Sequence, residues 1–225
     1  DYNLRLSGGT EMVTFSLSLD YLNQDGVLLG TDAKKYSLNS NVIYKGSDRL
    51  QIGAIISGSF WDRNESYTGA ESLMQGIARS LPIYGNIRAD GRYGETWLTT
   101  PGHNTWTHPV ATALEGGQNN KTQNAVINMF AEYRFPMDIK YKINFSVNKY
   151  DGYTHIFRPR IEKIHPKTLQ PKYMTTPRSV TRSNNSNLNT SFFQTLNWTK
   201  KIADHHDVNL LFGFSMESFY NSNFN

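Results

Sequence analysis

Residues 139–148 read IKYKINFSVN, and within this stretch apolar or aromatic side chains alternate with polar or charged ones. Because successive side chains of a β-strand point to opposite faces, the alternation predicts a strand with one apolar and one polar face. The same period of two recurs in residues 12–21, which read MVTFSLSLDY. Two-faced strands therefore dominate the predicted fold.

Outward from these two stretches, the alternation predicts about eight strands, at residues 2–7, 12–21, 36–45, 50–61, 125–133, 139–147, 188–199 and 207–220. The connections alternate in length, with short turns at 8–10, 45–49, 135–138 and 200–206 and long segments at 23–35, 62–123 and 151–186. Short turns at one end and long loops at the other are typical of antiparallel up-and-down transmembrane barrels. The expected fold class is therefore all-β, a segment of such a barrel with long outer loops.

Aromatic residues gather near the ends of the predicted strands, where a girdle at the lipid headgroups would lie. They are Tyr21, Tyr36, Tyr44, Trp61, Tyr133, Tyr150, Trp198 and Tyr220. A soluble β-sandwich with aromatic residues at its rim is the alternative, since sandwiches also alternate and turn frequently. The order of short and long connections favours the barrel.

In a barrel wall the two faces of each strand have different surroundings. We expect lipid outside the apolar face of Phe15, Leu17, Leu19, Ile143, Phe145, Leu210 and Phe212. We expect the water-filled lumen beside Ser16, Ser18, Asn144, Ser146 and Asn209.

One segment has helical spacing, Ala70 to Leu81 in the longest loop, where Pro82 and Gly85 follow. This short helix should fold back on its own loop. We expect Leu73, Met74 and Ile77 to anchor it against Ile83, Trp97 or Val110.

Composition excludes several classes of function. The 23 Lys and Arg and 19 Asp and Glu are scattered, which is unlike the basic stripe of a nucleic-acid-binding protein. There is no cysteine, so thiolate metal sites and cysteine nucleophiles are excluded. The His205-His206 pair lies on a turn without a third ligand at a recognisable spacing, and no nucleophile-elbow motif surrounds a serine. We therefore predict no enzyme, no catalytic residue, no metal site and no cofactor.

Candidate ligand-binding residues lie in the two longest loops. They are Tyr93, Trp97, Trp106 and His108 in the first, and Tyr153 and Arg158 in the second. Rings can stack on sugars, and polar or charged groups can hold hydroxyls or carboxylates. The alternative is that these rings pack the loops together, because large loops need a small core of their own.

Several strings resemble SusC-like TonB-dependent transporters of Bacteroidetes, in the order that this family shows. They are SGGTE at 7–11, FSLSLDYLNQDG at 15–26, KYSL at 35–38, RSLPIY at 79–84, DGRYG at 90–94, HPVA at 108–111 and HHDVNLLFGF at 205–214. His108 stands where the family usually has asparagine, which is a mild departure.

The resemblance implies that residues 1–225 are part of a barrel domain of roughly 22 strands, with the plug, the TonB box and the closing strands outside this chain. It also implies an outer-membrane location, contact with outer-membrane lipid, a SusD-like surface lipoprotein as lid, and energy from the TonB complex through the missing amino-terminal part. The implied function is uptake of a nutrient such as an oligosaccharide or peptide. The alternative function is a soluble or surface-attached β-domain that binds carbohydrate or protein.

Overall fold

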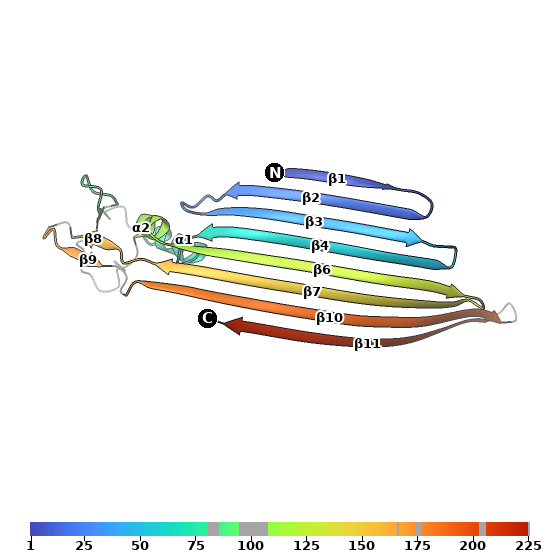
Figure 1. The fold of residues 1–225 in the computed structure, drawn as a ribbon. Coiled ribbons are helices and arrows are strands. Elements are labelled where there is room, and N and C mark those ends of the chain that lie inside the picture. Colours follow the sequence, from blue (N-terminus) through green and yellow to red (C-terminus); the bar gives the residue numbers. More distant parts are fainter. Residues whose placement is uncertain (81–85, 95–107, 166, 174–176, 203–205, 225) are drawn as a thin grey trace.

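Eight long strands form one antiparallel sheet in a computed structural model that describes residues 1–80, 86–94, 108–165, 167–173, 177–202 and 206–224 (Figure 1). The order in the sheet is β1-β2-β3-β4-β6-β7-β10-β11, so each long strand pairs with the next long strand along the chain. The long strands are β1 Tyr2–Gly9, β2 Val13–Asp25, β3 Asp32–Lys45, β4 Leu50–Glu65, β6 Gly117–Phe135, β7 Ile139–Arg158, β10 Ser179–Ile202 and β11 His206–Phe224. The predicted up-and-down arrangement of about eight strands is confirmed.

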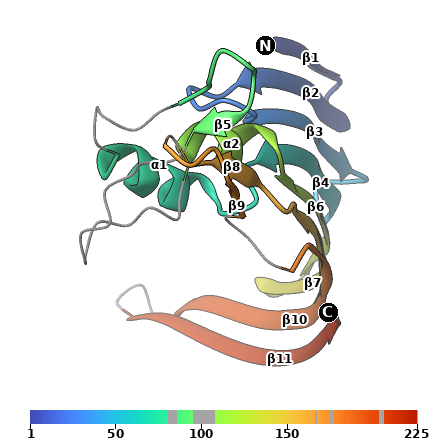
Figure 2. The same cartoon turned by 90° about the vertical axis from the view of Figure 1, so that its left-hand side faces the viewer.

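Smaller elements gather at one end of this sheet (Figures 1 and 2). They are helices α1 Ala70–Ala78 and α2 Pro109–Leu114, and strands β5 Tyr93–Gly94, β8 Glu162–Ile164 and β9 Pro171–Tyr173, which pair in a second sheet. We call these five elements the cap. The sequence predicted α1 alone, with an end at Leu81, whereas the helix ends at Ala78.

The sheet is open and curved, and β1 and β11 are its two edge strands (Figure 2). An unpaired strand edge presents free backbone N–H and C=O groups, which cannot be left in hydrocarbon. A membrane-spanning wall of this kind therefore requires further strands at both edges.

The register divides the sheet into two faces, because directly paired residues of antiparallel strands point to the same side. We call each set of directly paired residues across the sheet a row. The Phe15 row consists of Gly8, Phe15, Val42, Ala54, Met129, Phe145, Phe192 and Met216. The next row contains Ser7, Ser16, Asn41, Ile55, Asn128, Ser146, Ser191 and Glu217. The predicted division between an apolar set and a polar set is therefore confirmed.

The apolar face of the sheet is not covered by a second layer of the described residues. Buried apolar side chains of the described chain all lie outside the long sheet, at Tyr67, Leu73, Ala111, Ala113, Ile161 and Ile164. Apolar side chains of the wall, including Leu4, Phe15, Leu19, Val42, Met129 and Phe145, are exposed. The core of a two-layer sandwich is thus absent from the described part of the chain.

The long strands extend beyond their predicted ends at the cap side, so the predicted bounds of three connections, six strand ends in all, were wrong. Only residues 26–31, 66–116 and 159–178 connect strands there, in place of 23–35, 62–123 and 151–186. The added strand residues are largely polar on both faces, as in NQD at 23–25 and GQNNKT at 117–122. The strands keep their backbone hydrogen bonds in these residues although the hydrophobic alternation has stopped. The periodicity therefore could not predict these strand ends.

Aromatic side chains mark two levels of the apolar face. Tyr2, Tyr21, Tyr36 and Phe60 form one row toward the cap, and Tyr133 and Tyr141 pair near the other end. On β4 the two levels lie ten residues apart, because Leu50 pairs with Tyr133 and Phe60 with Tyr36. Ten residues span about 33 Å along a strand, or about 25 Å of height at a tilt near 40°, which is the usual height of an apolar barrel band.

Two residues of the predicted girdle lie on the other face. Trp61 and Tyr150 share rows with polar-face residues such as Gly152 and Asn187. The Trp61 ring is covered by cations, with Lys35 Nζ 4.8 Å and the Arg63 guanidinium 5.8 Å from its centroid. The position of Trp61 and Tyr150 near a strand end led to their assignment to the girdle. The face on which each side chain lies depends instead on whether its position along the strand is odd or even, and this places both on the polar face.

Candidate functional site

The polar face is richest in hydrogen-bonding side chains near the cap. These side chains lie in three rows of the same face. One row contains Asn124 and Asn187, another contains Thr122, Asn185 and Asn223, and a third contains Asn120, Thr154 and Ser183. Amide and hydroxyl side chains both donate and accept hydrogen bonds. This part of the wall can therefore bind neutral polar groups.

A pocket of about 530 Å³ lies in this region, between β4, β6, β7, β10 and β11. Its lining consists of Arg63, Asn120, Thr122, Tyr150, Gly152, Tyr153, Thr154, Ser183, Asn184, Asn185 and Asn223. We call it the mouth pocket. Gly152 leaves room for the ring of Tyr150, since a Cβ atom there would lie 3.0 Å from the Tyr150 hydroxyl. A volume of this size is typical of sites for small polar ligands.

Asn120 is held in place by a network that joins the wall to the cap. Its Nδ2 donates to Glu65 Oε1 at 2.6 Å, and Thr154 Oγ1 donates to its Oδ1 at 2.9 Å. Glu65 Oε2 accepts a 3.3 Å hydrogen bond from the backbone N–H of Ala70, where α1 begins. A side chain with both ends bonded keeps one rotamer, so Asn120 gives the mouth pocket a fixed edge.

The cap has its own small core on the polar side of the wall. Tyr67, Ala111 and Ile161 are buried against each other, and Tyr93 and Ile156 pack on them. Ile156 belongs to β7 and points to the polar face. Burial raises the pKa of the Tyr67 phenol, which keeps that group neutral. The cap is therefore docked inside the curve of the wall, as Figure 2 shows.

The structure brings together two predicted site residues, Tyr93 and His108, with ring centroids 5.0 Å apart. His108 is 7% exposed, and its Nδ1 accepts from Ala111 N at 3.1 Å as the N-cap of α2. Its Nε2 then carries the proton and donates to the Asn86 carbonyl at 2.9 Å. Both ring nitrogens are thus bonded inside the cap.

Tyr93 is held by its hydroxyl, which donates to Glu115 Oε1 at 2.6 Å. Burial, followed by this bond and the charge of Glu115, raises the pKa of Tyr93 to about 12. Tyr93 and His108 therefore support the cap through contacts of their own, as the packing alternative for these loop residues expects.

The remaining predicted site residues lie apart. Tyr153 borders the mouth pocket, but it shares the register parity of Phe145 on the apolar face. Arg158 ends β7 on the polar face and is exposed. Trp97 and Trp106 lie outside the described residues. Ile83, a predicted contact of the helix, and His205 of the His205-His206 pair also lie outside them.

Sequence reasoning missed the mouth pocket itself, including Arg63, Asn120, Tyr150 and Asn185. The signal in the sequence was the alternation itself. Each of these residues lies an even number of positions along its strand from a residue on the predicted lumen face, or from the register partner of one, and therefore shares that face. Of the predicted loop anchors, Leu73 is buried, whereas Met74 and Ile77 are 53% and 45% exposed and do not anchor α1.

No group of three or more histidine, aspartate and glutamate side chains among the described residues is placed to hold a metal ion. No helix in the described ranges combines the length and the apolar character that spanning a membrane would demand.

Comparison with known proteins gives two sequence relatives, while no protein-family model matches the chain. TonB-dependent receptor P3 of Formosa agariphila is 24% identical over 163 residues, which cover 69% of this chain and 16% of that protein. TonB-dependent receptor P26 of the same organism is 24% identical over 133 residues, which cover 58% of this chain and 13% of that protein. The chain thus spans about a sixth of the curated relatives it matches.

Solved structures show the same fold. The RagAB peptide importer in its closed-closed state matches with a TM-score of 0.69 and 17% identity, over 98% of this chain and 24% of that one. A second RagAB peptide transporter structure matches with a TM-score of 0.67 and 16% identity. The resemblance of this chain to TonB-dependent transporters is therefore confirmed by its sequence relatives, and its fold is that of the RagAB structures.

Proposed function

We propose that residues 1–225 form part of the wall and the outer mouth of an outer-membrane β-barrel that takes up a nutrient in a TonB-dependent step. One observation carries the proposal: a single sheet has an apolar face and a polar face, and the described residues cover the apolar face with no second layer. Water would oppose such exposure, whereas lipid would favour it. The soluble β-domain is the weaker alternative for the same reason.

The cargo that suits the mouth pocket is an oligosaccharide or a peptide. Asparagine, threonine and tyrosine side chains supply donors and acceptors for sugar hydroxyls or peptide amides. Arg63 adds a guanidinium that could hold a carboxylate. The peptide named for RagAB belongs to that protein, and it makes a peptide mixture a reasonable first substrate to test here.

The proposed partners are a SusD-like surface lipoprotein and the TonB complex. Apolar side chains at the cap end, Val27, Leu29, Ile87 and Leu114, are more than half exposed and offer contact area to a lid. The TonB complex would act on the transporter of which residues 1–225 form part.

Uptake by pocket variants of the full-length transporter tests the proposal. Asn185→Leu and Arg63→Gln remove hydrogen-bonding groups from the mouth pocket, and Asn189→Leu is the matched control on the same strand and face, outside the lining. We expect the two pocket variants to slow growth on an oligosaccharide or peptide mixture as sole carbon source, at normal barrel levels in the membrane. Equal growth of all three variants and the parent would contradict a cargo role for this pocket.

A further inference from the structure

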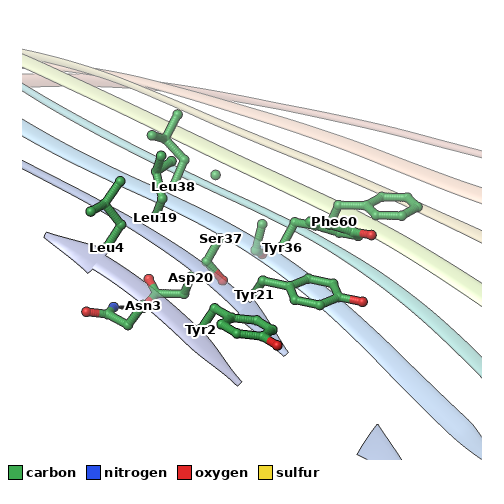
Figure 3. Close-up of a pocket in the computed structure, with 12 residues that line it drawn as sticks. Tyr2, Asn3, Leu4, Leu19, Asp20, Tyr21, Tyr36, Ser37, Leu38 and Phe60 are labelled. Atoms are coloured by element: carbon green, nitrogen blue, oxygen red, sulfur yellow. Dashed lines mark hydrogen bonds between the residues drawn. The ribbon is translucent and has the colours of Figure 1, made fainter. Parts of the chain in front are cut away.

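A second pocket, of about 590 Å³, opens on the apolar face of the wall (Figure 3). Leu4, Leu19 and Leu38 form one side of it, and the rings of Tyr2, Tyr21, Tyr36 and Phe60 form the other. The leucines and the rings belong to rows two residues apart on the same face. We call this pocket the outer groove.

The groove exists because the leucine row is interrupted. Leu38 pairs with Gly58, and Gly58 pairs with Ala125, so two small residues follow three leucines. The backbone does not require glycine at this position, since an added Cβ would meet nothing closer than the Asn124 carbonyl at 3.9 Å. A larger residue would fit there and would fill the groove.

The rings beside the groove are ordered, and their hydroxyls are available. Neighbouring centroids lie 6.2, 4.9 and 6.3 Å apart from Tyr2 through Tyr21 and Tyr36 to Phe60. The hydroxyls of Tyr2, Tyr21 and Tyr36 make no hydrogen bond to any residue that the structure describes. Tyrosine rings at a membrane interface place their apolar body in the chains and the hydroxyl among the headgroups.

A cation lies one row beyond the rings on the same face. Lys34 is two residues from Tyr36 along β3 and is exposed. Its neighbour across the strands, Asp62, is already bonded by Lys121 at 3.6 Å and by Asn119 Nδ2 at 2.6 Å. Asp32, two residues from Lys34 on the same face, accepts a 3.1 Å hydrogen bond from Asn64 Nδ2. Within the described ranges Lys34 forms no ion pair with either carboxylate, so its ammonium can meet a phosphate.

We propose that the outer groove binds one anionic phospholipid-like molecule of the outer leaflet, with an acyl chain along the leucines and its phosphate at Lys34. This inference rests on the proposed orientation of the wall. Groove, rings, hydroxyls and cation follow one another in the order in which a lipid changes from apolar chain to polar headgroup. The site would hold a specific lipid at the side of the transporter near its mouth.

Retention of lipid by the full-length transporter tests the site. The protein is reconstituted in nanodiscs of equal parts phosphatidylglycerol and phosphatidylcholine, released, and weighed by native mass spectrometry. Gly58→Leu fills the groove, and Gly213→Leu is its control, because a Cβ there likewise meets nothing closer than 3.9 Å and the residue lies on the polar face. We expect Gly58→Leu to lose bound lipid of both kinds while Gly213→Leu retains it.

The charge is tested separately with Lys34→Gln, against Lys45→Gln at the other end of β3. One lysine near an anionic headgroup contributes about 1 kcal/mol, so Lys34→Gln should lower the preference for phosphatidylglycerol about fivefold and leave phosphatidylcholine binding intact. Parent-like retention by both Gly58→Leu and Lys34→Gln, in protein that inserts normally, would overturn the lipid site alone. Failure of the parent to insert into nanodiscs would contradict the proposed function instead.

Discussion

At the scale of single residues, parity along a strand determines the surroundings of each side chain. Phe145 and Asn144 are adjacent on β7, yet the first lies among Met129 and Phe192 and the second beside Phe130 and Phe193 on the polar side. The sequence alternation predicted this division correctly at Phe145. It could not predict that apolar residues such as Phe130 also occur on the polar face, where that ring covers Gly53.

Arginine substitution should distinguish the two faces energetically. In a bilayer, Phe145→Arg near the middle of the wall should lower the free energy of unfolding by about 2 to 4 kcal/mol, because a charge must then enter hydrocarbon. Asn144→Arg should change it by less than about 1 kcal/mol, since water reaches that face. Guanidinium unfolding of the full-length transporter in vesicles measures both, and equal losses would argue against a lipid-facing wall.

Tyr93 should titrate apart from an ordinary tyrosine. Its pKa is raised from 10.0 to about 12 by burial and by Glu115, so the neutral phenol is favoured in the folded cap. The stability from this group is fully present below pH 10 and is lost as the pH rises through about 12. The ultraviolet difference titration between the parent and Tyr93→Phe gives this value directly, and a midpoint near 10 would show that neither the burial of Tyr93 nor its Glu115 contact persists in solution.

At the scale of elements, the long strands were more predictable than the cap. The hydrophobic period predicted eight strands because adjacent residues of each strand lie on opposite faces of the sheet, one apolar and one polar. It did not find α2, since six residues are too few for a helical period, and it did not find β5, β8 or β9, which have two or three residues each. Contacts between distant segments, such as Tyr67 with Ile161, specify the cap, and a single sequence carries little sign of them.

His108 should matter to the cap as the N-cap of α2. Replacement by alanine removes the acceptor for the Ala111 N–H and should cost the cap about 1 kcal/mol. His108→Asn should restore most of that loss, because asparagine is a strong N-cap residue and is usual at this position in the resembling family. Amide hydrogen exchange of residues 110–114 reports the change, and equal exchange in both variants would mean that the cap bond is unimportant.

At the scale of the whole molecule, the chain is a wall with a cap on one side. The apolar face is exposed, the polar face carries the mouth pocket, and the two are separated by one layer of backbone. The edges at β1 and β11 leave backbone N–H and C=O groups unpaired, which a sheet in hydrocarbon cannot tolerate. Parity could assign the lining residues of the pocket to the polar face, but their meeting in one pocket depends on the register of five strands, which the sequence does not give.

If the apolar face contacts lipid and the polar face contacts water, spin labels on adjacent residues of one strand should differ in their surroundings. These 225 residues contain no cysteine, so single cysteines at Leu17 and Ser18, adjacent on β2, give clean labelling sites in this region of the full-length transporter. In lipid vesicles the label at position 17 should be accessible to oxygen and shielded from a water-soluble nickel chelate, and the label at 18 should show the reverse. The same accessibility at both positions would contradict the account.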